Sequence, residues 1–159
     1  MKKLITIMVT FLGLAAIVLV PATAYASPPT TASGEMITLS MQPQGIRLAG
    51  GNMIIESISS GEMLGDIEGS WTAEGKMIIH PNGKVTSQAI MVVSPCTVAG
   101  RSGTLTMQAI ATGEGVLVQG SGVILHGTGE LSNLHGQGTW ESIEGVGGSY
   151  SMKIHFERD

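Results

Sequence analysis

The sequence predicts an all-β protein: a closed, antiparallel, up-and-down β-barrel of about eight strands. Three observations lead to this prediction. The 159 residues include 23 glycines, many of them clustered between short apolar runs. Inside those runs apolar and polar residues alternate with the period of two that marks a half-buried strand, as in residues 104–111 and 149–157. After residue 26, no segment carries an amphipathic pattern of helical length.

Nine extended segments are expected along the chain, separated mostly by glycine-rich turns. In order they are residues 36–41, 46–49, 53–60, 66–80, 84–93, 103–112, 116–125, 135–142 and 149–157. The third is expected to end in a turn at Gly61-Glu62. Pro81-Asn82-Gly83 is the strongest hairpin signal, because proline fixes one φ angle and Asn-Gly tolerates the positive φ of a tight turn. Residues 131–134 have the length of one helical turn.

The short links between these segments indicate how the sheet is arranged. Consecutive strands joined by hairpins form a meander, and an open meander leaves two unpaired edges that favour aggregation. Closing the sheet removes both edges, and a barrel of about eight strands encloses side chains or one small ligand. A β-sandwich is the alternative, but it needs long crossovers, and the links here are mostly of hairpin length. The sequence therefore favours the barrel.

Residues 1–26 have the pattern of a secretory signal peptide. Two lysines precede an uncharged apolar run, and Ala24-Tyr25-Ala26 is a cleavage site of the A-x-A type. Cleavage would release a secreted or periplasmic chain without a stable membrane anchor, and an uncleaved anchor is the alternative. Residues 27–34 are polar and contain two prolines, so we expect a flexible leader there. Residues 35–157 are expected to form the barrel domain.

Charge and cysteine content narrow the range of functions. Without the signal segment, 6 basic and 12 acidic residues remain, which gives a net charge of −6. Nucleic-acid binding is not expected, because it requires clustered Lys and Arg. Cys96 is the only cysteine, so no disulfide can form within the chain. It could act as a nucleophile or link two chains, but the favoured interpretation is a small apolar residue near a strand end.

No group of residues indicates a catalytic, metal or cofactor site. The four histidines lack the spacing of metal ligands, although strand pairing could bring them together. Asp66 and Glu68 share one face of a strand and could form a coupled carboxylate pair, but a solvated pair is the more ordinary interpretation. The sequence also lacks the G-x-S-x-G, H-E-x-x-H and phosphate-loop motifs.

The glycine-spaced segments resemble a bacterial family of unknown function, DUF3224. The resemblance is carried, in this order, by Gly100-Arg101-Ser102-Gly103, Gly120-Ser121-Gly122, Gly127-Thr128-Gly129-Glu130-Leu131 and Leu134-His135-Gly136-Gln137-Gly138. It covers residues 36–156. That family is thought to be similar to the allene oxide cyclase barrel, a relative of the lipocalin-like calycin barrels, which implies an eight-stranded antiparallel barrel of a kind that often forms trimers. The resemblance implies no activity. The family is commonly intracellular, whereas this chain carries an export signal.

The barrel interior is predicted to be rich in methionine. Eight methionines remain after residue 26, and aromatic residues are few. A plain apolar core is one interpretation, and an adaptable apolar cavity is the other, because methionine side chains are flexible and polarizable. For the cavity, the candidate ligand-binding residues are Trp71, Met77, Met107 and Tyr150.

Three functional hypotheses follow from the sequence. The leading one is a non-enzymatic binder of a small apolar or amphipathic molecule, with no cofactor and no metal. The second is a cyclase- or isomerase-like barrel that shapes an apolar substrate, which requires a carboxylate or histidine deep in the cavity. The third is a structural barrel that self-associates as a homo-oligomer.

Overall fold

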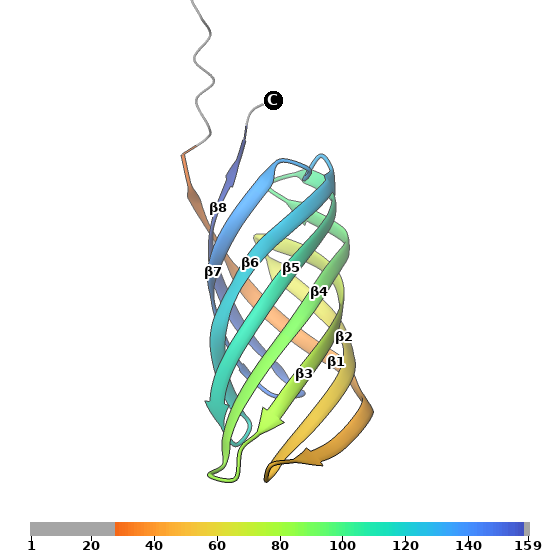
Figure 1. Cartoon of the computed structure of the whole chain (residues 1–159). Coiled ribbons are helices and arrows are strands. Elements are labelled where there is room, and N and C mark those ends of the chain that lie inside the picture. The colour runs from red at the N-terminus through yellow and green to blue at the C-terminus, as the bar shows by residue number, and fades with distance from the viewer. Residues whose placement is uncertain (1–27, 158–159) are drawn as a thin grey trace, which may run out of the picture.

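Eight strands account for most of residues 28–157, the part of the chain that the computed structural model describes (Figure 1). They are β1 (Thr30–Ala49), β2 (Asn52–Gly65), β3 (Ile67–Ile79), β4 (Lys84–Val98), β5 (Arg101–Glu114), β6 (Leu117–Gly129), β7 (Leu134–Ile143) and β8 (Gly147–Phe156). The predicted signal peptide, residues 1–26, lies outside the described residues. Within residues 28–157 there is no helix with the length and hydropathy needed to cross a membrane.

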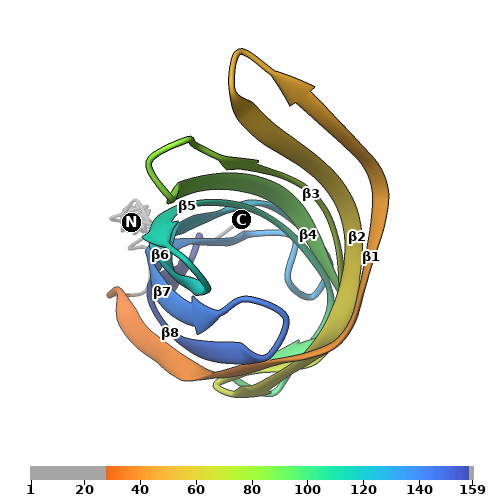
Figure 2. The same ribbon diagram turned by 90° about the horizontal axis from the view of Figure 1, so that it is seen from below.

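The strands form one closed sheet in which each strand pairs with its neighbours in sequence and β8 pairs back with β1. Every pair is antiparallel. The closing pair joins residues 30–37 of β1 to residues 147–154 of β8. Seen along its axis, the strands follow one another around a ring (Figure 2). The predicted up-and-down barrel is confirmed.

The start of β1 corrects the predicted domain boundary. Residues 30–34, expected to belong to a flexible leader, pair with residues 150–154 of β8. Ala32 is buried in the barrel wall. These residues look like a linker because they are small and polar, but backbone pairing with β8 places them in the sheet. The barrel therefore begins at Thr30 rather than at residue 35.

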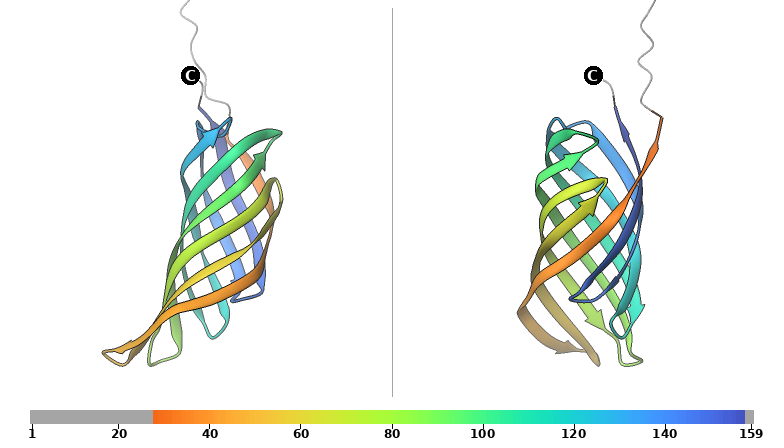
Figure 3. Two further views of the ribbon diagram at one scale, coloured as in Figure 1. Left: turned by 90° about the vertical axis from the view of Figure 1, so that its right-hand side faces the viewer. Right: turned by 180° about the vertical axis from the view of Figure 1, so that it is seen from behind.

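The two segments expected at 36–41 and 46–49 are a single strand, since β1 is 20 residues long. Pro43 lies between the two expected segments. The pairing with β2 shifts register at Leu39 and again at Gln44. Each shift is a β-bulge, which leaves one residue unpaired and lets the strand continue beyond it. Beyond residue 38, β1 pairs with β2 alone, and the β1–β2 hairpin projects past the rest of the barrel (Figure 3).

The turn expected at Gly61-Glu62 and the helical turn considered for residues 131–134 also differ from the structure. β2 continues through Gly61-Glu62 and ends at Gly65. Gly61 pairs with Trp71 of β3, and a Cβ at position 61 would lie 2.7 Å from Trp71 Cζ2, so this glycine makes room for the indole instead of forming a turn. β6 extends to Gly129, and residues 130–133 form hydrogen-bonded turns with no helix.

The interior is packed most completely at the end of the barrel where β1 begins and β8 ends. The largest fully buried side chains all lie there: Met63, Ile67, Leu105, Leu131, Leu134, Val93, Val98 and Cys96. Above them Arg101 lies over the ring of Phe156, with its Cζ atom 3.9 Å from the ring centroid. Side chains therefore close this end of the barrel.

Candidate functional site

A cavity of about 150 Å³ lies inside the barrel, next to the packed end. All four candidate residues, Trp71, Met77, Met107 and Tyr150, line it. They come from β3, β5 and β8 and meet because each lies at an inward position of the alternating pattern. Trp71, Met107 and Tyr150 are buried, and Met77 is half-buried. The structure thus brings together the residues that the sequence suggested, around one space.

A row of small residues explains why side chains of the protein do not fill this space. Strand pairing aligns Ser57, Gly75, Ala89, Ala109, Gly122 and Gly138 on six neighbouring strands, from β2 to β7. All six line the cavity. Large residues stand two positions away on the same strands, among them Met91, Met107 and Trp140. A band of side chains that are too short to meet across the barrel, held between bands of long ones, leaves a void.

Methionine is the most frequent residue type in the cavity wall. Seven of the eight methionines after residue 26 line it: Met36, Met41, Met63, Met77, Met91, Met107 and Met152. Met36 pairs directly with Met63, and Met91 with Met107, so the thioethers are grouped on two parts of the wall. Flexible and polarizable side chains let such a wall adjust to the shape of an occupant.

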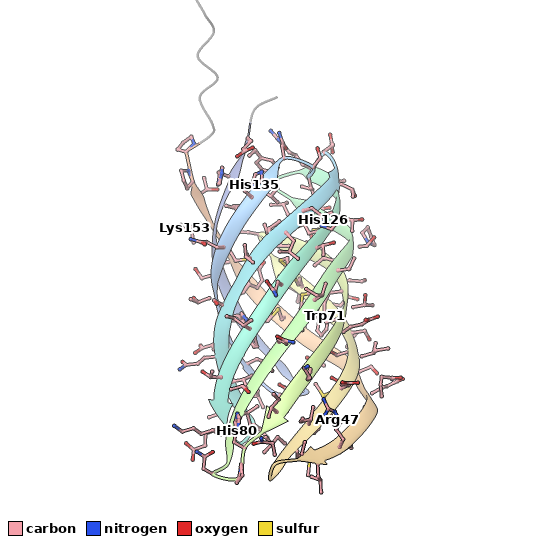
Figure 4. All side chains as sticks on the ribbon, in the orientation of Figure 1. Arg47, Trp71, His80, His126, His135 and Lys153 are labelled. Carbon is pink, nitrogen blue, oxygen red and sulfur yellow. The ribbon has the colours of Figure 1, made fainter. Side chains whose placement is uncertain are left out.

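Both tryptophans border the cavity, one from β3 and one from β7. Figure 4 labels Trp71 within the barrel wall. The Nε1 atoms of Trp71 and Trp140 are buried and have no hydrogen-bond partner in the structure. Buried indole N–H groups usually have an acceptor, which makes these two donors unusual.

The hydroxyl of Tyr150 is engaged by the backbone. It accepts a hydrogen bond from Ile67 N–H at 2.9 Å, and the carbonyl oxygens of Ile67 and Leu64 lie at 3.1 and 3.3 Å as acceptors for its own proton. Burial is the main cause that raises the pKa of this phenol. Tyr150 therefore offers its ring to the cavity, while its hydroxyl ties β8 to the β2–β3 connection across Gly34 of β1.

Replacing Tyr150 with phenylalanine is expected to lower the free energy of unfolding by about 1–3 kcal/mol, because the buried N–H of Ile67 loses its acceptor. Urea denaturation followed by tryptophan fluorescence measures the change. An unchanged midpoint and slope would show that the hydroxyl is not a structural tie.

Glu144 is the acidic residue that lines the cavity. It sits in the β7–β8 turn, which is braced on two sides: Glu144 N–H donates to Val116 O at 2.8 Å, and Thr38 N–H donates to Val146 O at 2.9 Å. Burial raises the pKa of the Glu144 carboxyl. No other Asp or Glu and no His among residues 28–157 lines the cavity, and Glu144 lies on a turn at the end of the strands. The deep carboxylate or histidine that the cyclase-like hypothesis requires is therefore not found in the described barrel.

The four histidines are not gathered into one cluster. His135 and His155 pair across β7 and β8 with their rings stacked 5.5 Å apart, and His135 Nε2 lies 3.5 Å from a carboxylate oxygen of Glu157. His126 lies near the same end of the barrel and His80 near the opposite one (Figure 4). The described residues contain no group of three or more His, Cys, Asp or Glu side chains that could hold a metal ion.

Asp66 and Glu68 do not act as a pair on one strand face. Asp66 precedes β3, and its Oδ2 accepts a hydrogen bond from Ser33 N–H at 2.8 Å. Both residues are exposed. The more ordinary interpretation, solvated carboxylates at a strand end, is the one that the structure supports.

Cys96 is buried in β4, and burial raises the pKa of its thiol to about 11. This environment suits a small apolar residue and disfavours the thiolate that a nucleophile or a cross-linking cysteine needs. We expect its reaction with a disulfide reagent at pH 8 to be at least about 100-fold slower in the native protein than in guanidinium. A fast native reaction, followed by absorbance, would contradict the buried placement.

The sequence did not single out Trp140 or the row of small residues. Trp140 shares the inward face of β7 with Gly136 and Gly138 and repeats the G-x-W pattern of Trp71, so its position could have been inferred. The row depends on the register of six strands, and a register cannot be read from alternation alone.

Comparisons with known proteins agree with this fold. No family model matches the sequence, and no curated protein matches it either. A solved structure of a protein of unknown function from the DUF3224 family, from Shewanella oneidensis MR-1, is similar to the barrel with a TM-score of 0.69. It shares 21% sequence identity, and the match covers 82% of this chain and 99% of that chain. The chain therefore has the fold of a DUF3224 protein, as the resemblance in its glycine-spaced segments implied.

Proposed function

We propose that this protein is a non-enzymatic binder that holds a small apolar or amphipathic molecule inside its barrel. The observation that carries the proposal is the cavity of about 150 Å³, bordered by seven methionines and two tryptophans. Apolar cavities of about this size in other protein cores bind benzene-sized molecules. The flexible methionine wall extends the range of shapes that fit. With the signal peptide expected in residues 1–26, the binder would act outside the cytoplasmic membrane.

Native mass spectrometry of protein purified from its own host tests this proposal. We expect a mass increment that organic extraction removes and that the extract identifies. Gly122→Leu, which fills the cavity, is the matched control and should be purified without the increment. A wild-type protein that carries no adduct, and whose melting temperature does not respond to saturating benzene-sized compounds, would overturn the proposal.

The free edge of β1 favours self-association as a second candidate function. Residues 39–49 pair with β2 on one side, and no described strand pairs with their other edge. Three apolar side chains of this segment are more than half exposed, namely Leu39, Ile46 and Leu48. Its only charge is Arg47. A second copy that pairs antiparallel with this edge would bury both edges in one symmetric interface.

Light scattering coupled to size-exclusion chromatography tests this candidate over a range of concentrations. We expect a dimer that Leu48→Lys dissociates, because a lysine at the edge disfavours strand pairing. Lysine at exposed Ile110 on the outer face of β5 is the matched control and should leave the dimer intact. A wild-type monomer at the highest concentration would rule this candidate out.

A further inference from the structure

Two unpaired hydrogen-bond donors, carried by tryptophans that line the cavity, support an inference about what it binds, which rests on the proposed function. The indole nitrogens of Trp71 and Trp140 are both buried, and no oxygen, nitrogen or sulfur atom in the structure accepts a hydrogen bond from either. A buried donor without an acceptor is destabilising and rare in native proteins. Both donors belong to residues that line one cavity, which favours an occupant of that cavity as the source of the acceptor.

The positions of the two rings suit this role. Trp71 lies on β3 and Trp140 on β7, with three strands between them in the closed sheet on either side. Trp71 packs with the buried core near the closed end, whereas Trp140 packs against both that core and the smaller cluster of Val85, Ala111 and Val118. The cavity therefore has one tryptophan on each of two opposite parts of the barrel wall.

The rest of the lining limits the chemistry of the occupant. Thioether sulfur interacts favourably with aromatic rings, and seven methionines border the cavity. Glu144 and Lys76 are the charged residues that border the cavity, and the rest of its lining is mostly apolar. A mostly apolar lining disfavours the burial of a charged ligand.

We propose that the ligand is an uncharged aromatic or unsaturated molecule that carries an oxygen acceptor, and that the indole N–H of Trp71, Trp140 or both donates a hydrogen bond to that oxygen. A carbonyl or ether oxygen has the required chemistry. Aliphatic hydrocarbons lack the acceptor and would leave both donors unpaired.

Two probes of nearly identical shape test the inference: acetophenone, which carries a carbonyl oxygen, and α-methylstyrene, in which a methylene group replaces that oxygen. Titrations monitored by calorimetry should show that acetophenone binds about 5-fold more tightly, the effect of one net hydrogen bond. The chain after residue 26 contains two tryptophans, so the mature protein gives two indole N–H resonances in a ¹⁵N–¹H spectrum. Acetophenone should move at least one of them downfield, and α-methylstyrene should not.

Trp71→Phe and Trp140→Phe identify the donor, because phenylalanine keeps a ring and removes the N–H. The variant that removes the donor should lower the acetophenone preference to about 1-fold, while the other variant keeps it. The wild-type spectrum still shows whether an indole N–H donates to the carbonyl oxygen of acetophenone, even if one variant does not fold. Equal binding of the two probes with unchanged indole resonances overturns this inference and leaves the proposed function standing. Binding of neither probe counts against the proposed function itself.

Discussion

Replacing Gly34 with alanine is expected to lower the free energy of unfolding by roughly 3 kcal/mol or more and the melting temperature by roughly 10 °C. A Cβ at this position would overlap the carbonyl oxygen of Leu64 and lie 2.6 Å from the Tyr150 hydroxyl. The backbone around Gly34 cannot shift to relieve this overlap, because Gly34 is paired on both sides, with Gly65 and with Tyr150. Calorimetry and urea denaturation measure the loss.

Gly122→Ala is the matched control, since it adds the same methyl group to another strand of the same barrel. A Cβ there has one neighbour within 4 Å, the carbonyl oxygen of Gln108 at 3.6 Å. Its stability should equal that of the wild type or exceed it by about 0.5 kcal/mol. Equal stability of the two alanine variants would contradict the close packing of the Tyr150 side chain against Gly34 of β1.

Gly122→Leu is expected to abolish ligand binding while the barrel stays folded. Gly122 belongs to the row of small residues, on β6, and it lines the cavity without a side chain to fill it. A leucine would project into the space of about 150 Å³ and occupy most of it. We expect affinity for a benzene-sized probe to fall at least about 10-fold, with a change in unfolding free energy of less than about 1.5 kcal/mol.

The series alanine, valine and leucine at position 122 makes this expectation quantitative, because affinity should fall stepwise as the side chain grows. Isothermal titration calorimetry measures the affinity, and far-UV circular dichroism confirms the fold of each variant. An exposed control on the same strand, Val123→Leu, should bind like the wild type. Full binding by folded Gly122→Leu would place the ligand outside the barrel.

The alternating pattern was sufficient to predict the inward faces. Trp71, Met107 and Tyr150 point inward because strand geometry places every second side chain on one face. Hydropathy was less informative at the first strand. Residues 30–34 contain no large apolar side chain, yet the last strand needs a partner there, and this requirement appears only once the sheet closes.

The cavity could not be derived from the sequence in the same way. Gly75, Ala89 and Ala109 are separated along the chain, and each looks like an ordinary small strand residue. They become one feature only through the hydrogen-bond register of four strand pairs between β3 and β7. The sequence also suggested a turn at Gly61, because a glycine that marks a turn and one that accommodates a tryptophan look identical in one dimension.

The pairing of the first strand with the last has a consequence for how the chain reaches its native state. Lys153 Nζ donates a hydrogen bond to Thr31 Oγ1, across 122 positions of sequence. Hairpins such as β4–β5 require only local encounters, whereas this seam brings together the most distant described parts of the polypeptide. Forming such non-local contacts is slow, because the entropy of closing a long loop is lost before the contacts compensate. Ring closure should therefore be the late, rate-limiting event of folding. Until the last strand pairs, the sheet would present two unpaired strand edges, and these favour aggregation with other copies of the chain.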